Sequence, residues 1–109
     1  MGRPVTLRLS ADALRLRLSA DDLRRLAEAG AVTGEVAVAP GLALRYALRT
    51  AAVDRLGAEL DGAALTVRLP RDWVAAWAAG DRVGFEGTQE AGDGRRLRIL
   101  VEKDLGCRH

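Results

Sequence analysis

The sequence predicts a mainly β protein of the α+β class, with two short helices, in which two internally duplicated ββαββ units form one pseudo-two-fold barrel. Apolar and polar residues alternate in several short runs, as is typical of half-buried strands. Two segments carry the signals that begin and end a helix. The order of these elements occurs twice along the chain.

The duplication predicts the domain organisation. Ala13–Leu18 recurs as Ala64–Leu69, at an offset of 51 residues. Each half has about 50 residues, too few for a secure core of its own, so we expect one domain over 1–109 built from repeats at approximately 3–50 and 53–104. The identical pairs at this offset are Ala13/Ala64, Leu14/Leu65, Arg17/Arg68, Leu18/Leu69, Asp21/Asp72, Ala27/Ala78, Val32/Val83 and Glu35/Glu86. When two more residues are allowed as an insertion in the second half, Leu44-Arg45 also matches Leu97-Arg98.

The first half begins with a predicted hairpin. Every second residue of Val5–Leu9 and of Leu14–Leu18 is apolar, which predicts two half-buried strands with Arg15 and Arg17 on the solvent side. The short link 10–13 predicts the hairpin connection between them.

A helix and a second hairpin are expected next. Ser19, with a carboxylate three residues later, predicts the start of the helix, and Gly30 suits its C-terminal cap. Strands are expected at Val32–Val38 and Leu42–Leu48, with a turn at Pro40-Gly41. In the second of these strands the inward residues are predicted to be Leu42, Leu44, Tyr46 and Leu48.

The second half repeats this order. Strands are predicted at Val53–Leu60 and Ala64–Leu69 around an Asp61-Gly62 turn, which favours the positive φ of a tight hairpin. A helix is predicted at Trp73–Ala79, where Pro70 and Asp72 mark its start and Gly80 its end. A strand at Val83 and Phe85 and a loop at 89–94 follow. The last strand is predicted to point Leu97, Ile99 and Val101 inward.

Charge and composition limit the functions to consider. The formal net charge is +2, too small to indicate a polyanionic partner, although residues 1–50 carry the excess of arginine. Cys107 is the only cysteine, so no internal disulfide can form, and no apolar run is long enough to span a membrane. We therefore expect a cytoplasmic protein without membrane partners.

The second half resembles the swapped-hairpin barrel family of bacterial regulators, such as AbrB, SpoVT and MazE. Members have a strand ending in Ile-Pro or Leu-Pro, a short helix, and then Gly-Asp-x-Val; Leu69-Pro70 and Gly80–Val83 stand in those places. The first half departs from the pattern, since Ser19 replaces the proline and Gly-Asp is absent before Val32. Members are usually homodimers, so the resemblance implies two fused subunits and a monomer in solution.

A second resemblance is to a family of small uncharacterised bacterial proteins. The shared segments are Leu14–Leu18, Leu44-Arg-Tyr-Ala47 and Leu97–Asp104. This resemblance implies no function.

The first candidate site is a basic surface formed by Arg15, Arg17, Arg24 and Arg25. The swapped-hairpin resemblance implies DNA contacts from arginines on the second strand and the helix, and guanidinium groups suit phosphate and guanine. The alternative is a solvated strand and helix face whose arginines pair with neighbours such as Asp21, Asp22 or Glu35. A contiguous, unpaired arrangement would favour the DNA-binding interpretation.

The second candidate site is Trp73 and Trp77, one helical turn apart on the same helix face. Tryptophan is enriched at interface hot spots, so an exposed pair would anchor a protein partner. The alternative is that both pack in the core, which otherwise has few aromatic residues.

Neither a catalytic nor a metal site is indicated. The only histidine is His109, and Asp21 and Asp72 are explained by helix capping. Cys107 and His109 are too few to hold zinc. No cofactor is expected.

The sequence therefore predicts a non-enzymatic binding or interaction module whose partner is an unknown protein or duplex DNA. One alternative is a DNA-binding transcriptional regulator of the swapped-hairpin type. Another is an antitoxin-like module whose C-terminal tail wraps a protein partner, but the predicted flexible tail, 105–109, is short for that role.

Overall fold

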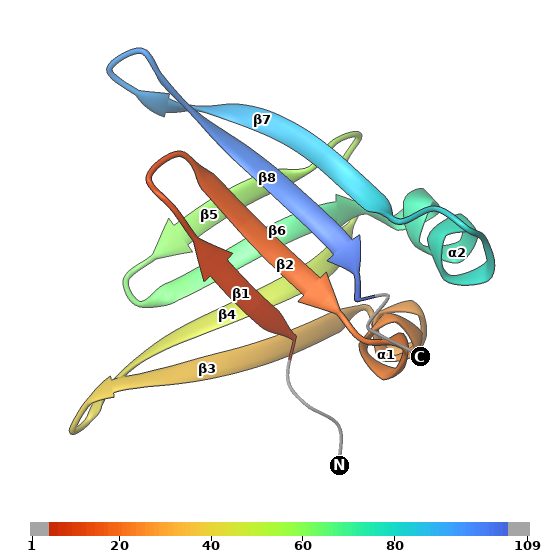
Figure 1. Ribbon diagram of the computed structural model, residues 1–109, viewed down its shortest axis with the longest axis horizontal. Helices are drawn as coiled ribbons and strands as arrows, with labels where there is room; N and C mark the ends of the chain where they lie inside the picture. Colours follow the sequence, from red (N-terminus) through yellow and green to blue (C-terminus); the bar gives the residue numbers. More distant parts are fainter. Residues whose placement is uncertain (1–4, 105–109) are drawn as a thin grey trace.

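The computed structural model describes residues 5–104, and it confirms a mainly β architecture with two short helices (Figure 1). The helices lie at the same end of the molecule. The elements in chain order are β1 (Thr6–Leu9), β2 (Ala13–Leu18), α1 (Ala20–Ala29), β3 (Ala31–Ala39), β4 (Leu42–Ala51), β5 (Gly57–Asp61), β6 (Ala64–Pro70), α2 (Arg71–Ala79), β7 (Gly84–Gly92) and β8 (Arg95–Lys103).

The strands form two four-stranded sheets, one in front of the other in Figure 1. Sheet A has the order β1-β2-β8-β7, and sheet B has the order β3-β4-β6-β5. Each sheet therefore joins one hairpin from each half of the chain, through the parallel pairs β2–β8 and β4–β6. The expected barrel is not a continuous ladder, because the edge strands of one sheet do not pair with those of the other.

The strand registers of the two halves coincide. Ala13 pairs with Arg98 between β2 and β8, and Ala64 pairs with Arg45 between β6 and β4, so positions correspond at an offset of 51 in the first hairpin and 53 in the second. Both long hairpins also have a bulge at the corresponding place. We call residues related by these offsets equivalent positions.

The pairing corrects part of the sequence alignment. Val32 pairs with Leu48, and the residue that occupies its place in the second half is Phe85, which pairs with Val101. The two extra residues therefore lie between α2 and β7. Val83, predicted to be in the strand, precedes it and is exposed, and Glu35 and Glu86 are not equivalent positions.

The core lies between the sheets and is built mainly from leucine and valine. The inward alternation is confirmed for Leu14, Leu16 and Leu18, all of which are buried. The largest fully buried side chain is that of Trp77. Other core members are Leu26, Leu48, Val67, Leu69, Ile99 and Val101.

The two helices begin and end differently. Ser19 forms the predicted capping box, because its hydroxyl accepts from the Asp22 N–H and the Asp22 carboxylate accepts from the Ser19 N–H, each at 3.1 Å. Gly30 ends α1 with a φ of 83°, as its predicted cap role requires. Helix α2 follows Pro70 without a side-chain cap, and Gly80 after it is extended.

Several predicted boundaries were wrong. The strand expected at Val53–Leu60 is confined to β5, Gly57–Asp61. The loop expected at 89–94 belongs mostly to strands, because β7 continues to Gly92 and β8 begins at Arg95. Leu9 and Leu42, expected to face the core, are exposed because their ends of the hairpins extend beyond it.

Candidate binding site

The predicted basic surface is divided into ion pairs. Arg15 and Arg17 on β2 share Glu102 of β8, with N···O distances of 3.7 and 3.6 Å. On α1, Arg24 pairs with Asp21 and Arg25 lies 3.9 Å from Asp22. The four arginines thus take the paired arrangement, which counts against a free positive face for DNA.

The predicted tryptophan anchor is largely part of the core. Trp77 is fully buried, donates its indole N–H to the Val83 carbonyl at 3.3 Å, and meets Phe85 edge to face. Trp73 is partly buried and stacks on Phe85, with ring centroids 4.7 Å apart. Arg82 covers the Phe85 ring at 4.3 Å. Trp77 is therefore not available as an exposed anchor.

The remaining sequence candidates add no site to the described part of the chain. Cys107 and His109 lie outside it, as does the predicted tail. Across residues 5–104, no three histidine, cysteine or acidic side chains are grouped as metal ligands would be. In the same range, neither helix has the length and hydropathy needed to cross a membrane.

The structure presents a different candidate at the two seams where the sheets meet. The seam between β5 and β7 is closed by Gln89 of β7. The Gln89 side-chain oxygen accepts from the Ala58 N–H at 2.8 Å, and its amide N–H donates to the Ala58 carbonyl at 2.9 Å. This amide therefore satisfies the edge of β5 as a neighbouring strand would.

The other seam, between β1 and β3, lacks this closure. The position equivalent to Gln89 is Val36, and the position equivalent to Ala58 is Leu7. Strand β1 pairs with β2 in the same register as β5 pairs with β6. The backbone N–H and carbonyl of Leu7 therefore point toward the β1–β3 seam, as those of Ala58 point toward the β5–β7 seam. Valine has no group that can bond to them. We call this region the β1–β3 seam.

Tyr46 fixes the inner end of the β1–β3 seam. Its hydroxyl donates to the Val5 carbonyl at 2.7 Å. Gly34 of β3 makes room for it, because a Cβ at position 34 would overlap the Tyr46 ring. Burial, with a smaller contribution from the Asp22 carboxylate, raises the pKa of Tyr46 above its usual value of 10.0. The seam is therefore anchored at Val5 and open beyond it.

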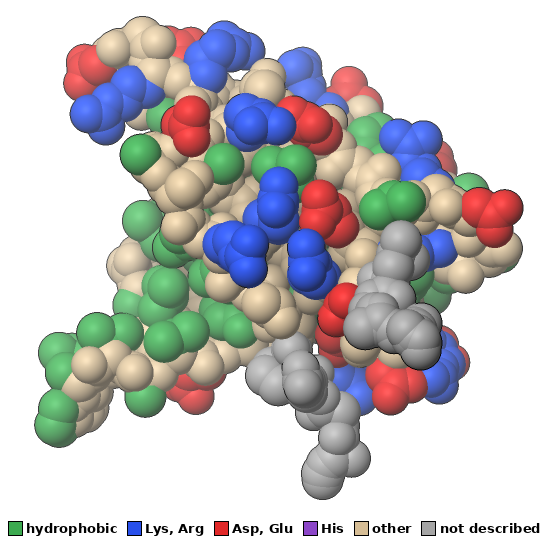
Figure 2. Space-filling view, in the orientation of Figure 1, with side chains coloured by type: hydrophobic (Ala, Val, Ile, Leu, Met, Phe, Trp, Pro, Cys, Tyr) green, Lys and Arg blue, Asp and Glu red, His purple; other side chains and the backbone are tan. Residues whose placement is uncertain are grey.

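Large apolar side chains are exposed at the open end. Figure 2 shows hydrophobic side chains along the projecting β3–β4 hairpin at the lower left. At the equivalent positions of the β7–β8 hairpin, Gln89, Ala91 and Arg95 replace Val36, Val38 and Leu42. The exposed fractions are 56% for Leu9, 44% for Val36, 70% for Val38 and 64% for Leu42. Leu60 of β5, at the position equivalent to Leu9, lies at the other seam and is 66% exposed, so exposure there is common to both halves.

Positive charge lies beside the seam on the outer face of sheet A. Arg8 of β1 is exposed and opposite Arg15 of β2. Arg15 and Arg17 have one carboxylate between them, that of Glu102. Figure 2 shows basic side chains gathered over the front sheet, with acidic ones among them. This rim has an excess of arginine over carboxylate.

Sequence reasoning missed the β1–β3 seam, although a signal was present. Residues 36–42 read Val-Ala-Val-Ala-Pro-Gly-Leu, and the equivalent residues 89–95 read Gln-Glu-Ala-Gly-Asp-Gly-Arg. An apolar hairpin tip in one half and a polar tip in the other is visible once the correct offset is known. The insertion before β7 concealed it.

Comparison with known proteins identifies a family and no activity. The chain belongs to a family of unknown function, DUF7009, whose sequence profile matches residues 5–109. This agrees with the resemblance to uncharacterised proteins and gives no support to a relationship with the AbrB-like family. No curated protein and no solved structure matches the chain.

Proposed function

We propose that this protein is a non-enzymatic interaction module that binds an extended segment of another protein along the β1–β3 seam. The observation that carries the proposal is the difference between the two seams. Gln89 closes one, whereas Val36 stands in its place at the other, and no side chain within residues 5–104 bonds to the Leu7 main chain there. An unpaired strand edge is a template for an added strand.

The main chain supplies the affinity in this mode. Leu7 faces the seam with one donor and one acceptor, and β3 is the edge strand of sheet B across from it. A peptide strand entering the seam would bond to these groups as Gln89 does to Ala58. Backbone pairing of this kind does not depend on the side chains of the partner.

The side chains define the partner's chemistry. Every second residue of the partner would face Val36, Val38 and Leu9, which favours large apolar groups there. The residues between them would face outward beside Arg8 and the arginine-rich rim, which favours Asp or Glu. The preferred partner is a strand that alternates apolar with acidic residues.

A second copy of the chain fits this chemistry less well. The projecting hairpin has no charged residue from Val36 to Leu44, so a second copy's hairpin would bring no carboxylate to Arg8. A monomer that binds a different, acidic partner is therefore the form we propose. The predicted duplication of a ββαββ unit is supported by the matched registers of the two halves.

A display library of random short peptides tests the proposal. Selection against the wild-type protein is expected to enrich alternating apolar and acidic sequences. The Val36→Gln variant, which copies the closed seam, serves as the counter-selection and should not enrich them. A matched control is Ala91→Gln on the opposite hairpin, which should enrich the same peptides as wild type. Enrichment that survives Val36→Gln, or no enrichment with wild type, contradicts the proposal.

A further inference from the structure

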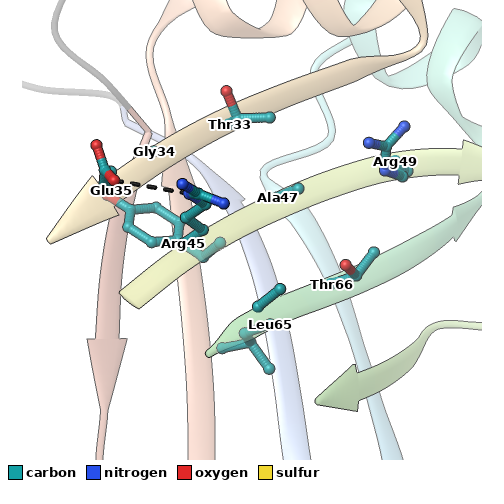
Figure 3. Close-up of a pocket in the computed structure, with 10 residues that line it drawn as sticks. Thr33, Gly34, Glu35, Arg45, Ala47, Arg49, Leu65 and Thr66 are labelled. Atoms are coloured by element: carbon teal, nitrogen blue, oxygen red, sulfur yellow. Dashed lines mark ion pairs between the residues drawn. The ribbon is translucent and has the colours of Figure 1, made fainter. Parts of the chain in front are cut away.

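The outer face of sheet B contains a hollow whose lining includes Gly34 and Tyr46, the two residues that meet at the inner end of the β1–β3 seam. Its volume is about 460 Å³, within the range of small-molecule sites. Thr33, Ala47 and Thr66 lie side by side across β3, β4 and β6, as the strand registers require (Figure 3). Arg45 and Arg49 flank Ala47 along β4, one on each side of this row.

The hollow exists because a small residue occupies the middle of the face. On the outer face of sheet A, the position equivalent to Ala47 is Leu100, whose side chain is buried among its neighbours. Ala47 has no side-chain atoms beyond Cβ and leaves that space open. The two sheets thus differ at one central position, filled in one and empty in the other.

The charges around the hollow are also unbalanced. Arg49 of β4 lies opposite Arg68 of β6, and like charges opposite each other are destabilising. At the equivalent positions of sheet A, Glu102 lies opposite Arg17 and the two form an ion pair. Sheet B therefore has a second arginine where sheet A has the balancing carboxylate.

The nearby carboxylates are already paired with other arginines. Glu59 pairs with Arg68, and Glu35 lies 3.6 Å from Arg45, the pair marked in Figure 3. Within residues 5–104, Arg49 has no ion pair. The charged residues that line the hollow are Arg45, Arg49 and Glu35, which leaves a net charge of +1 with Arg49 as the unbalanced group.

We propose that this hollow binds a small molecule that carries a phosphate group. The phosphate lies over Ala47 between the Arg49 guanidinium and the Thr66 hydroxyl, where charge-assisted hydrogen bonds replace the repulsion between Arg49 and Arg68. The rest of the ligand extends toward Thr33 and the Arg45–Glu35 pair. These groups suit hydroxyl substituents, so the ligand class is a small hydroxyl-bearing phosphate ester. The site does not depend on the function proposed for the seam.

Titration with inorganic phosphate and with ribose 5-phosphate, followed by amide chemical shifts, tests the site. Saturable shifts are expected at Thr33, Ala47, Arg49 and Thr66, and ribose 5-phosphate should bind more tightly than inorganic phosphate because only it reaches Thr33. Sodium chloride of matched ionic strength separates a defined site from screening. Absence of saturable shifts with either phosphate up to about 10 mM overturns the proposal.

Two variants copy the residues that sheet A uses in the same places. Arg49→Glu provides Arg68 with a carboxylate, and Ala47→Leu fills the hollow as Leu100 does. Each is expected to fold and to weaken ribose 5-phosphate binding by about tenfold or more. Arg49→Gln is a milder variant that removes only the charge and should show the same direction.

An arginine elsewhere provides the control. Arg8→Gln removes an exposed charge from the outer face of sheet A and should leave ribose 5-phosphate binding unchanged. Binding that persists in Arg49→Glu and Ala47→Leu, or that falls equally in Arg8→Gln, overturns the site.

Discussion

Exchanging the residues that distinguish the two seams tests how each is held. Gln89→Val is expected to open the β5–β7 seam, because it removes the hydrogen bonds of 2.8 and 2.9 Å to Ala58. A neutral hydrogen bond contributes about 0.5–1.5 kcal/mol net, so the two together contribute about 1–3 kcal/mol. Water can reach this partly buried site, which places the loss near the lower end of that range.

Chemical denaturation monitored by circular dichroism measures this loss. A decrease of about 1–2 kcal/mol in the free energy of unfolding is expected, with a fall in Tm of about 4–8 °C per kcal/mol. Glu90→Gln, on the same strand and exposed, is the matched control and should change stability by no more than about 0.5 kcal/mol.

The reciprocal variant completes the test. Val36→Gln places an amide opposite Leu7 and is expected to raise the free energy of unfolding by about 1 kcal/mol, since Val36 is already 44% exposed and little burial is lost. If the Gln89→Val variant unfolds at the same denaturant concentration as wild type, the Gln89 amide does not hold the β5–β7 seam and the reasoning is refuted.

The remaining predictions concern the core, the titration of Tyr46, assembly and DNA. Trp77→Ala should lower the free energy of unfolding by about 3–5 kcal/mol in denaturant, because the side chain is fully buried; a loss below about 1 kcal/mol would contradict its core role. Because the pKa of Tyr46 is raised in the folded state, its contribution to stability should be complete below about pH 10 and lost as pH rises through the raised value; Tyr46→Phe should abolish this dependence, and a wild-type curve identical to the variant's would contradict the shift. Sedimentation should show a monomer, and a stable dimer would favour a second copy as the occupant of the seam. Anisotropy of labelled duplex DNA at about 50 mM salt should show no binding, since the four predicted arginines are paired, and salt-sensitive binding lost on Arg24→Gln would restore the DNA-binding interpretation.

Alternation and capping signals predicted much of the fold because they are local. Period-2 alternation identified the inward faces of β2 and β6, and Ser19 with Asp22 identified the start of α1. The repeated pattern of the sequence predicted that the halves share a core. It did not predict the separation into two sheets, because that depends on which edge strands pair.

The candidate site could not be predicted from the same signals. Val36 and Leu42 continue the apolar alternation of buried residues, and nothing in their local sequence shows that the hairpin extends past the body of the protein. Gln89 lies in a polar, glycine-containing stretch that is typical of a loop, and only the register of β7 on β8 brings its amide to Ala58. The projection of the β3–β4 hairpin and the contact of Gln89 with Ala58 are both long-range properties of the fold.

Hydrogen exchange of the Leu7 amide, with and without a peptide selected on the wild-type protein, tests the central claim most directly. The account predicts that the Leu7 amide exchanges rapidly in the free protein, whereas the Ala58 amide at the other seam is protected. When the peptide is bound, the Leu7 amide should become protected. A Leu7 amide that is as protected as Ala58 without the peptide, or a bound peptide that leaves Leu7 unprotected, would contradict an open seam that accepts a strand.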